Sequence, residues 1–142
     1  MGSRHAENCG MLAPSHGVAM TRLTIRIDFD DARSLGHGKI RLIELIDRHG
    51  SISAAARAMD MSYRRAWLLI DEVNQMFAEP VIESQTGGKG GGFAKLTVFG
   101  RALVQIYRTI EKESLDVFGK RLGELEARLK PVTQPETQKL PG

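Results

Sequence analysis

The sequence contains little cysteine and no long apolar run. Its 142 residues include a single cysteine, Cys9, which has no partner for a disulfide within the chain. No CxxC pair and no cysteine–histidine spacing of a zinc site occurs. No apolar stretch approaches the roughly 18 residues that a membrane-spanning helix requires. These absences argue against a disulfide-rich, zinc-binding or membrane protein, and they favour a cytoplasmic one.

Catalytic and metal-binding patterns are scarce too. The histidines are widely separated in the sequence, at His5, His16, His37 and His49. Asp28, Asp30 and Asp31 lack the ligand spacing of an EF-hand, and a solvated strand end explains them. We therefore expect no enzyme, no cofactor and no metal site.

What the chain does have is a slight excess of positive charge. Its 20 Lys and Arg residues outnumber 17 Asp and Glu residues, which gives a formal net charge of +3. Hydrophobic residues make up 42% of the chain, an ordinary share for a globular protein. The excess suits an anionic partner but is common among proteins. The position of the positive charges is therefore more informative than their number.

A strand and a helix are predicted before residue 50. Residues 22–28 alternate between polar and apolar, with Leu23, Ile25 and Ile27 on one face, which predicts a half-buried strand. Residues 39–48 carry apolar side chains at helical spacing. Gly50 supplies the positive φ that commonly ends a helix. We expect residues 1–20 to form a disordered tail.

Residues 51–77 have the pattern of a helix-turn-helix. An alanine-rich segment predicts a short helix that starts at Ser53, whose hydroxyl would cap it. A turn at Asp60 follows, and Ser62 would cap a helix from Tyr63 to about Phe77. One stripe of this second helix is apolar and is expected to be buried; it consists of Ala66, Ile70, Val73 and Phe77.

The start of this second helix is the main candidate for a functional site. Tyr63, Arg64 and Trp67 fall on a face away from the buried stripe. A recognition helix presents its N-terminal residues to the base edges of DNA in this way, so double-stranded DNA is the predicted partner. Two plainer interpretations stay open. The arginines can belong to a solvated helix face, and Trp67 can pack only against a neighbouring hairpin.

A glycine-rich hairpin follows the helix-turn-helix. Residues 81–83 and 93–96 predict two short strands, and five glycines surround Lys89 between them. Free backbone N–H groups and one lysine suit contact with phosphate, so the hairpin is interpreted as a wing. A Walker A loop does not fit, because Lys89 is followed by Gly90 and a strand. A hairpin tip without function is the alternative.

Thr97 would cap a long final helix. Its apolar residues recur every three or four positions over about thirty residues, or roughly 45 Å of helix. A small domain cannot cover that length, so the helix either pairs with a second chain, which we prefer, or folds back on the core. The residues assigned to dimerisation are Phe99, Leu103, Ile106, Ile110, Val117 and Phe118.

These features resemble the N-terminal DNA-binding domain of ModE-type regulators, the molybdate-responsive transcription factors of prokaryotes. The likeness covers residues 21–118, and it rests on Gly50-Ser-Ile-Ser, Met61-Ser-Tyr, Ala66-Trp67, Asn74-Gln75 and above all the stretch from Thr86 to Gly92 with Leu96-Thr97. It implies a mainly α fold with a small β wing, a winged helix-turn-helix with a long C-terminal dimerisation helix. It also implies a homodimer that regulates transcription from a palindromic operator.

Carried over by position, the resemblance implies two groups of DNA-binding residues. The reading end of the recognition helix would comprise Ser62, Tyr63, Arg64, Arg65 and Trp67. The tip of the wing would comprise Thr86, Gly87, Gly88 and Lys89.

The chain departs from the family pattern after this domain. Family members continue into oxyanion-binding β domains, whereas residues 119–130 fit the distal end of the long helix and residues 131–142 a disordered tail. We therefore expect a stand-alone DNA-binding form for which an oxyanion effector is doubtful. The alternatives are a protein–protein interaction module that uses the same fold and an oxyanion-responsive binder without DNA affinity.

Overall fold

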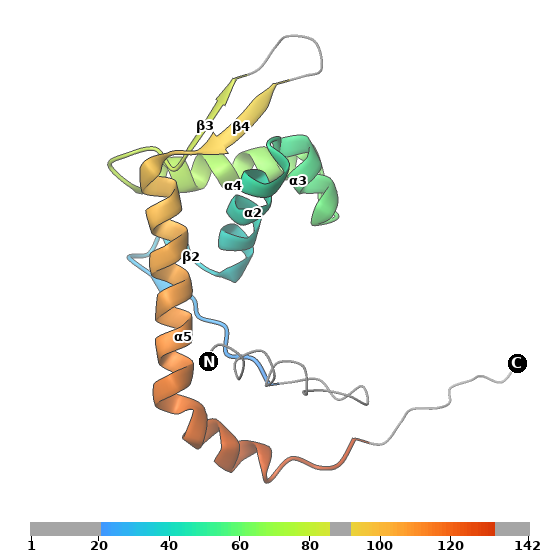
Figure 1. The fold of residues 1–142 in the computed structure, drawn as a ribbon, viewed down its shortest axis with the longest axis vertical. Coiled ribbons are helices and arrows are strands. Elements are labelled where there is room, and N and C mark those ends of the chain that lie inside the picture. The colour runs from blue at the N-terminus through green and yellow to red at the C-terminus, as the bar shows by residue number, and fades with distance from the viewer. Residues whose placement is uncertain (1–20, 86–91, 133–142) are drawn as a thin grey trace, which may run out of the picture. The chain divides into compact units, whose positions relative to one another are not determined.

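The computed structural model describes residues 21–85 and 92–132 (Figure 1). In chain order, the elements are β1 (Ile27–Asp28), β2 (Ser34–Leu35), α2 (His37–His49), α3 (Ile52–Ala58), α4 (Tyr63–Met76), β3 (Ile82–Gln85), β4 (Phe93–Leu96) and α5 (Val98–Glu126). Residues 23–113 form one compact unit, and the described residues after 113 belong to a second unit. The mainly helical fold with a two-stranded wing agrees with the sequence prediction.

Helices α2, α3 and α4 build most of the core of the 23–113 unit. Ile40, Ile43 and Ile46 of α2 are buried, as their helical spacing predicts. The helix starts two residues before the predicted Lys39 and ends where expected. Gly50 has a φ of 76°, and its N–H donates to the carbonyl of Ile46 at 2.8 Å.

The cap of α3 differs from the prediction. Ser51, and not Ser53, is the N-cap, and its hydroxyl accepts the N–H of Ala54 at 3.0 Å. Starting the helix two residues earlier places Ile52 in the core, where it is buried. The predicted cap of α4 is confirmed, because the Ser62 hydroxyl accepts the N–H of Arg65 at 3.1 Å.

The strand predicted over residues 22–28 is much shorter in the structure. Only Ile27 and Asp28 pair, and their antiparallel partners are Leu35 and Ser34. The apolar side chains of residues 23–27 are half-buried and the polar ones exposed, so the predicted alternation holds. The ladder is short because a tight turn, in which Asp30 accepts the N–H of Ala32, leaves a partner strand of two residues.

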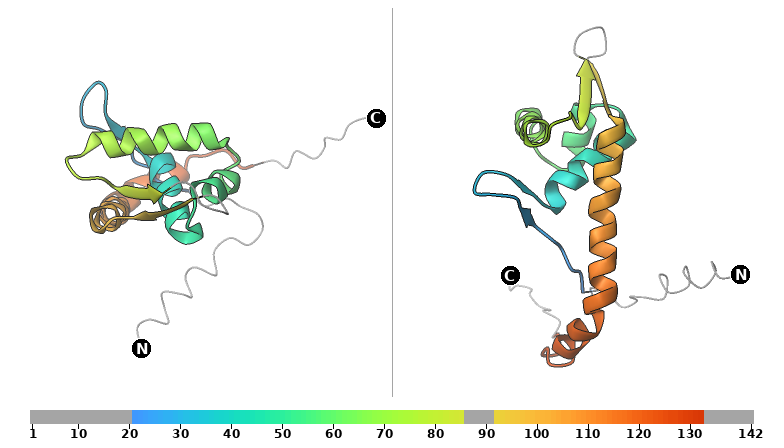
Figure 2. Two further views of the ribbon diagram at one scale, coloured as in Figure 1. Left: turned by 90° about the horizontal axis from the view of Figure 1, so that it is seen from above. Right: turned by 90° about the vertical axis from the view of Figure 1, so that its left-hand side faces the viewer.

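The β3–β4 hairpin is the predicted wing. Its register pairs Ile82 with Leu96 and Gln85 with Phe93. The N–H of Ala94 donates to the carbonyl of Gly50 at 3.0 Å, which ties the hairpin to the end of α2. The strands project beyond α4 in Figure 1 and in the right view of Figure 2. The wing-tip residues Thr86, Gly87, Gly88 and Lys89 lie outside the described residues.

Helix α5 begins against the core. Thr97 caps it as predicted, because its hydroxyl accepts the N–H of Gly100 at 2.8 Å. Leu103 and Tyr107 are buried about two and three turns after Thr97. The helix ends at Glu126, earlier than the predicted end at residue 130. No helix within residues 21–85 and 92–132 combines the length and apolarity that crossing a membrane requires.

Two glycines of α5 provide a test of this packing. A Cβ at Gly100 would collide with the backbone carbonyl of Val81, whereas a Cβ at Gly119 would meet nothing within 4 Å. Gly100→Ala should therefore lower the free energy of unfolding by about 1–3 kcal/mol. Gly119→Ala, the matched control in the same helix, should leave it unchanged or raise it by up to about 1 kcal/mol. Urea denaturation measures both, and equal effects would contradict the close approach at Gly100.

Candidate nucleic-acid interface

The N-terminus of α4 is exposed and positively charged. Ser62, Tyr63, Arg64, Arg65 and Trp67, the predicted reading residues, are all exposed. No ion pair formed within the described part of the chain involves Arg64 or Arg65. Both guanidinium groups are therefore available to an anionic ligand.

The two arginines occupy different sides of α4. Ala66 is fully buried, and at about 100° per residue Arg64 lies nearly opposite to it. Arg65 lies on a flank, where it lines a shallow pocket of about 580 Å³ together with Lys39 and Met61. Of the two side chains, Arg64 faces outward more directly and is the stronger candidate for contact with bases.

Asn74 fixes the start of the wing on α4. Its side-chain Oδ1 accepts the N–H of Val81 at 2.7 Å and the N–H of Ile82 at 3.1 Å. Its Nδ2 donates to the carbonyl of Ile82 at 3.2 Å. Val81 and Ile82 are buried, so these backbone groups have no access to water as a substitute partner. One amide side chain therefore sets the position of β3 relative to α4.

The same backbone segment also holds the start of α5. The hydroxyl of Thr97 lies 2.8 Å from the carbonyl of Pro80 and 3.2 Å from that of Val81. The N–H of Thr97 donates to the carbonyl of Val81 at 3.0 Å. Residues 80–82 thus form a junction between α4, the wing and α5, which we call the 80–82 junction.

The exposed face of the wing is charged near its base and carries the apolar ring of Phe93 nearer its tip. Glu83 pairs with Lys95 across the two strands, and Gln85 pairs with Phe93. These four side chains are exposed, whereas Ala94 on the opposite face is buried. This alternation leaves one side of the hairpin free to meet a ligand.

The predicted dimerisation residues divide into two groups. Leu103 is buried in the core of its own chain, and Phe99 is half-buried with its ring 5.3 Å from that of Phe77. Within the described residues, the other four predicted positions keep exposed surface; they are Ile106, Ile110, Val117 and Phe118. Intrachain packing therefore accounts for the first two residues and leaves the other four at least partly exposed.

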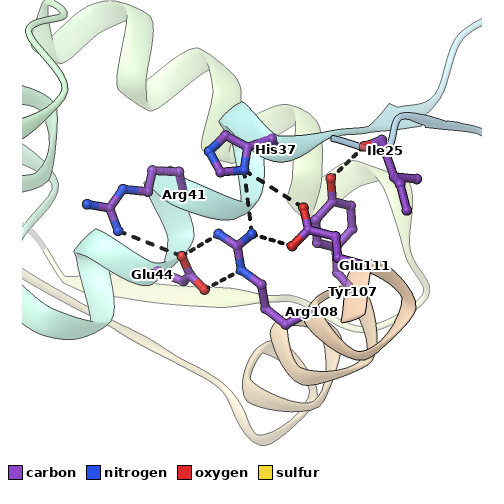
Figure 3. A network of polar contacts seen from close by, with 7 residues as sticks. All are labelled: Ile25, His37, Arg41, Glu44, Tyr107, Arg108 and Glu111. Atoms are coloured by element: carbon purple, nitrogen blue, oxygen red, sulfur yellow. Dashed lines mark hydrogen bonds and ion pairs between the residues drawn. The ribbon is translucent and has the colours of Figure 1, made fainter. Parts of the chain in front are cut away.

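A polar network holds α5 to α2 (Figure 3). Arg108 donates to both carboxylate oxygens of Glu44, through Nε and Nη2, at 2.8 Å each. Its Nη1 donates to Glu111 at 2.6 Å and lies 3.5 Å from Nδ1 of His37. The hydroxyl of Tyr107 donates to the carbonyl of Ile25 at 2.5 Å. A bidentate arginine–carboxylate pair fixes orientation as well as distance.

Glu44 and Arg108 each stabilise the charged form of the other. The hydrogen bonds that Arg108 donates to Glu44 lower the pKa of the Glu44 carboxyl and raise the pKa of the Arg108 guanidinium. Burial raises the pKa of the Tyr107 hydroxyl. The Glu44–Arg108 ion pair therefore persists throughout the neutral pH range.

Three residues with structural importance escaped the sequence analysis. Leu68 is 48% exposed on the outer face of α4. The sequence did not predict this exposure, because Leu68 precedes Leu69 and Ile70 in a short apolar run that is typical of buried residues. The roles of Asn74 and Arg108 depend on contacts across the fold, although Asn74 stands within one of the motifs of the family resemblance.

The sequence of the chain is similar to those of proteins named ModE. No protein-family profile matches the chain. The molybdenum transport protein ModE of Azotobacter vinelandii is 40% identical over 113 residues, which are 76% of this chain and 42% of that protein. The DNA-binding transcriptional dual regulator ModE of Escherichia coli (strain K12) is 42% identical over 82 residues, 56% of this chain and 31% of that protein.

A second group of relatives carries a different name. The molybdenum-pterin-binding protein MopA of Rhodobacter capsulatus is 39% identical over 105 residues, which are 74% of this chain and 37% of that protein. The chain thus spans less than half the length of each of these relatives. The described fold is a winged helix-turn-helix with a long C-terminal helix. Within that class the chain is ModE-like, as the sequence motifs predicted.

Asn74→Ala tests whether this side chain fixes the wing. The variant leaves the N–H groups of Val81 and Ile82 without their acceptor, so the free energy of unfolding should fall by about 1–3 kcal/mol. Gln75→Ala, an exposed neighbouring amide, should change it by less than about 0.5 kcal/mol. Thermal denaturation followed by circular dichroism compares the two. Equal stability of both variants would mean that other contacts hold the wing.

Proposed function

We propose that the chain binds double-stranded DNA as a homodimer and regulates transcription from a two-fold symmetric operator. The observation that carries this proposal is the exposed N-terminus of α4, where Arg64 and Arg65 have no ion-pair partner among the described residues. Side chains at this position of a recognition helix reach base edges in the major groove. The name of the E. coli relative, a DNA-binding transcriptional dual regulator, supports the proposal.

In this proposal the wing contacts the DNA backbone beside the recognition helix. Lys89, together with Thr86, Gly87 and Gly88, supplies a positive charge and backbone N–H groups for phosphate oxygens. Asn74 and the 80–82 junction keep the base of the wing beside α4. Phosphate contacts of this kind set affinity and register, whereas Arg64 supplies base recognition.

The exposed apolar residues of α5 form the dimer interface in this proposal. Ile106, Val117 and Phe118 are 55%, 67% and 52% exposed. Exposure of several large apolar side chains on one helix to water is unfavourable and is typical of an interface. A two-fold pair would present two recognition helices to successive major grooves, with half-sites about 34–36 Å apart. Each monomer alone would make half of the contacts.

A ligand-binding role is the second candidate function, because relatives named molybdenum-pterin-binding proteins also match the chain. Calorimetry with molybdate and with tungstate separates the two candidates. A saturable heat together with an absence of DNA binding would favour the ligand-binding role.

Substitutions of Arg64 and Lys89 should have different consequences for DNA binding. Arg64→Ala removes a base contact and should lower the affinity for the preferred site by about 1–3 kcal/mol, with little effect on unrelated DNA. Lys89→Ala removes a phosphate contact, so it should weaken binding to all sequences and reduce the salt slope by about one unit. Mobility shifts at two salt concentrations, with specific and unrelated duplexes, measure both effects.

Arg121→Ala is the control for the loss of one positive charge, since Arg121 is an exposed residue of α5 that pairs with Glu124. It should change binding little. Equal, sequence-independent losses from Arg64→Ala and Lys89→Ala would contradict base recognition by Arg64.

Charged residues at Ile106 and Ile110 should disrupt the dimer. The double variant Ile106→Asp, Ile110→Asp places two carboxylates on the proposed interface, so light scattering should give the mass of one chain. Operator affinity should fall by more than tenfold, because a monomer contacts a single half-site. Leu115→Asp serves as a control on another side of α5. A wild-type chain that is monomeric at concentrations where it protects an operator would contradict this interface.

A further inference from the structure

Three large apolar side chains are exposed within six residues of α4. Tyr63, Trp67 and Leu68 are 49%, 45% and 48% exposed, whereas Ala66 between them is fully buried. Single exposed apolar residues are ordinary on a protein surface, but a cluster on one element marks an interaction surface. This cluster surrounds Arg64, with Leu68 one turn further along the same outer face.

The fold itself does not require these side chains to be apolar. Trp67 and Leu68 do not belong to the hydrophobic core or to the half-buried residues that pack against it, whereas the adjacent Leu69 does. No pair of aromatic rings in the described part of the chain includes Tyr63 or Trp67. The plainer interpretation of Trp67, packing against the wing, stays a prediction, because the wing residues 86–91 lie outside the described residues. Burial of Tyr63, Trp67 and Leu68 against a ligand would explain why these exposed side chains are apolar.

The residue types on the outer face of α4 indicate which DNA bases it can contact. The first two turns of α4, residues 63–70, contain no Asn, Gln, Asp or Glu. In the major groove, Asn and Gln recognise adenine, carboxylates recognise cytosine, arginine recognises guanine, and apolar side chains contact the C5-methyl group of thymine. Among the exposed hydrogen-bonding side chains of residues 63–70, Arg64 faces outward most directly, and it lies beside apolar surface suited to methyl groups.

We propose that Trp67 and Leu68 read the C5-methyl groups of thymines that lie next to a guanine contacted by Arg64. This inference rests on the proposed DNA binding and deepens it by naming the bases of the preferred half-site. The methyl group is the only difference between thymine and uracil in DNA. Burial of one methyl group stabilises a complex by about fourfold in affinity, so uracil at a contacted position should weaken binding by about that factor.

The test begins with the full chain and a random-sequence duplex library, from which bound sites are selected and sequenced. Each thymine of the selected site is then replaced by uracil, one position at a time. Wild type should lose about fourfold in affinity at one to three positions beside a guanine, and nothing at flanking thymines. Leu68→Ala and Trp67→Ala should each bind thymine and uracil equally at one of those positions. Leu68→Met, which keeps apolar reach, should retain the preference.

The outcomes separate this inference from the function on which it rests. No enrichment of any sequence from the library would overturn the proposed operator binding. Enrichment of a site whose uracil versions all bind wild type as tightly as the thymine version would overturn methyl reading and leave DNA binding intact. A uracil effect that survives in both alanine variants would also overturn the assignment. Circular dichroism confirms that each variant is folded, and Leu68→Ala decides the matter if Trp67→Ala does not fold.

Discussion

The backbone of residues 80–82 is the point on which α4, the wing and α5 all depend. Asn74 of α4 holds this segment through three hydrogen bonds. Thr97 holds it from the start of α5, and Gly100 allows α5 to approach the carbonyl of Val81. A displacement of this segment would therefore move the wing relative to α4. A DNA-binding winged helix must bring both its recognition helix and its wing into contact with the same DNA duplex. The 80–82 junction therefore sets the geometry of the proposed interface.

Helix α5 combines two environments along one element. Its first turns are part of the core through Leu103 and Tyr107, and Arg108 joins them to Glu44 of α2 by a bidentate ion pair. Further along, Val117 and Phe118 are exposed. A helix that belongs to the core at its start and carries exposed apolar side chains further along suits the proposed contact between two protomers. This arrangement links the proposed dimer to the spacing of the recognition helices.

Local signals account for what the sequence predicted well. Gly50, Ser62 and Thr97 end or cap helices through their own backbone and hydroxyl chemistry, and each does so in the structure. The cap of α3 was misplaced because Ser51 and Ser53 offer the same hydroxyl, and only the burial of Ile52 decides between them. The length of β1 was not predicted, because it is limited by its partner strand β2, which has two residues. Asn74 and Arg108 act through partners 7 to 8 and 64 residues away, which no local pattern reveals.

Hydrogen exchange with and without a selected DNA duplex tests the central claim, that DNA contacts the chain through the N-terminal turns of α4 and the wing. We predict slower amide exchange on DNA binding in residues 62–68 and in the hairpin from 82 to 96, and unchanged exchange in residues 40–48 of α2. Protection confined to α2 or α5, with residues 62–68 unaffected by a bound duplex, would contradict the account.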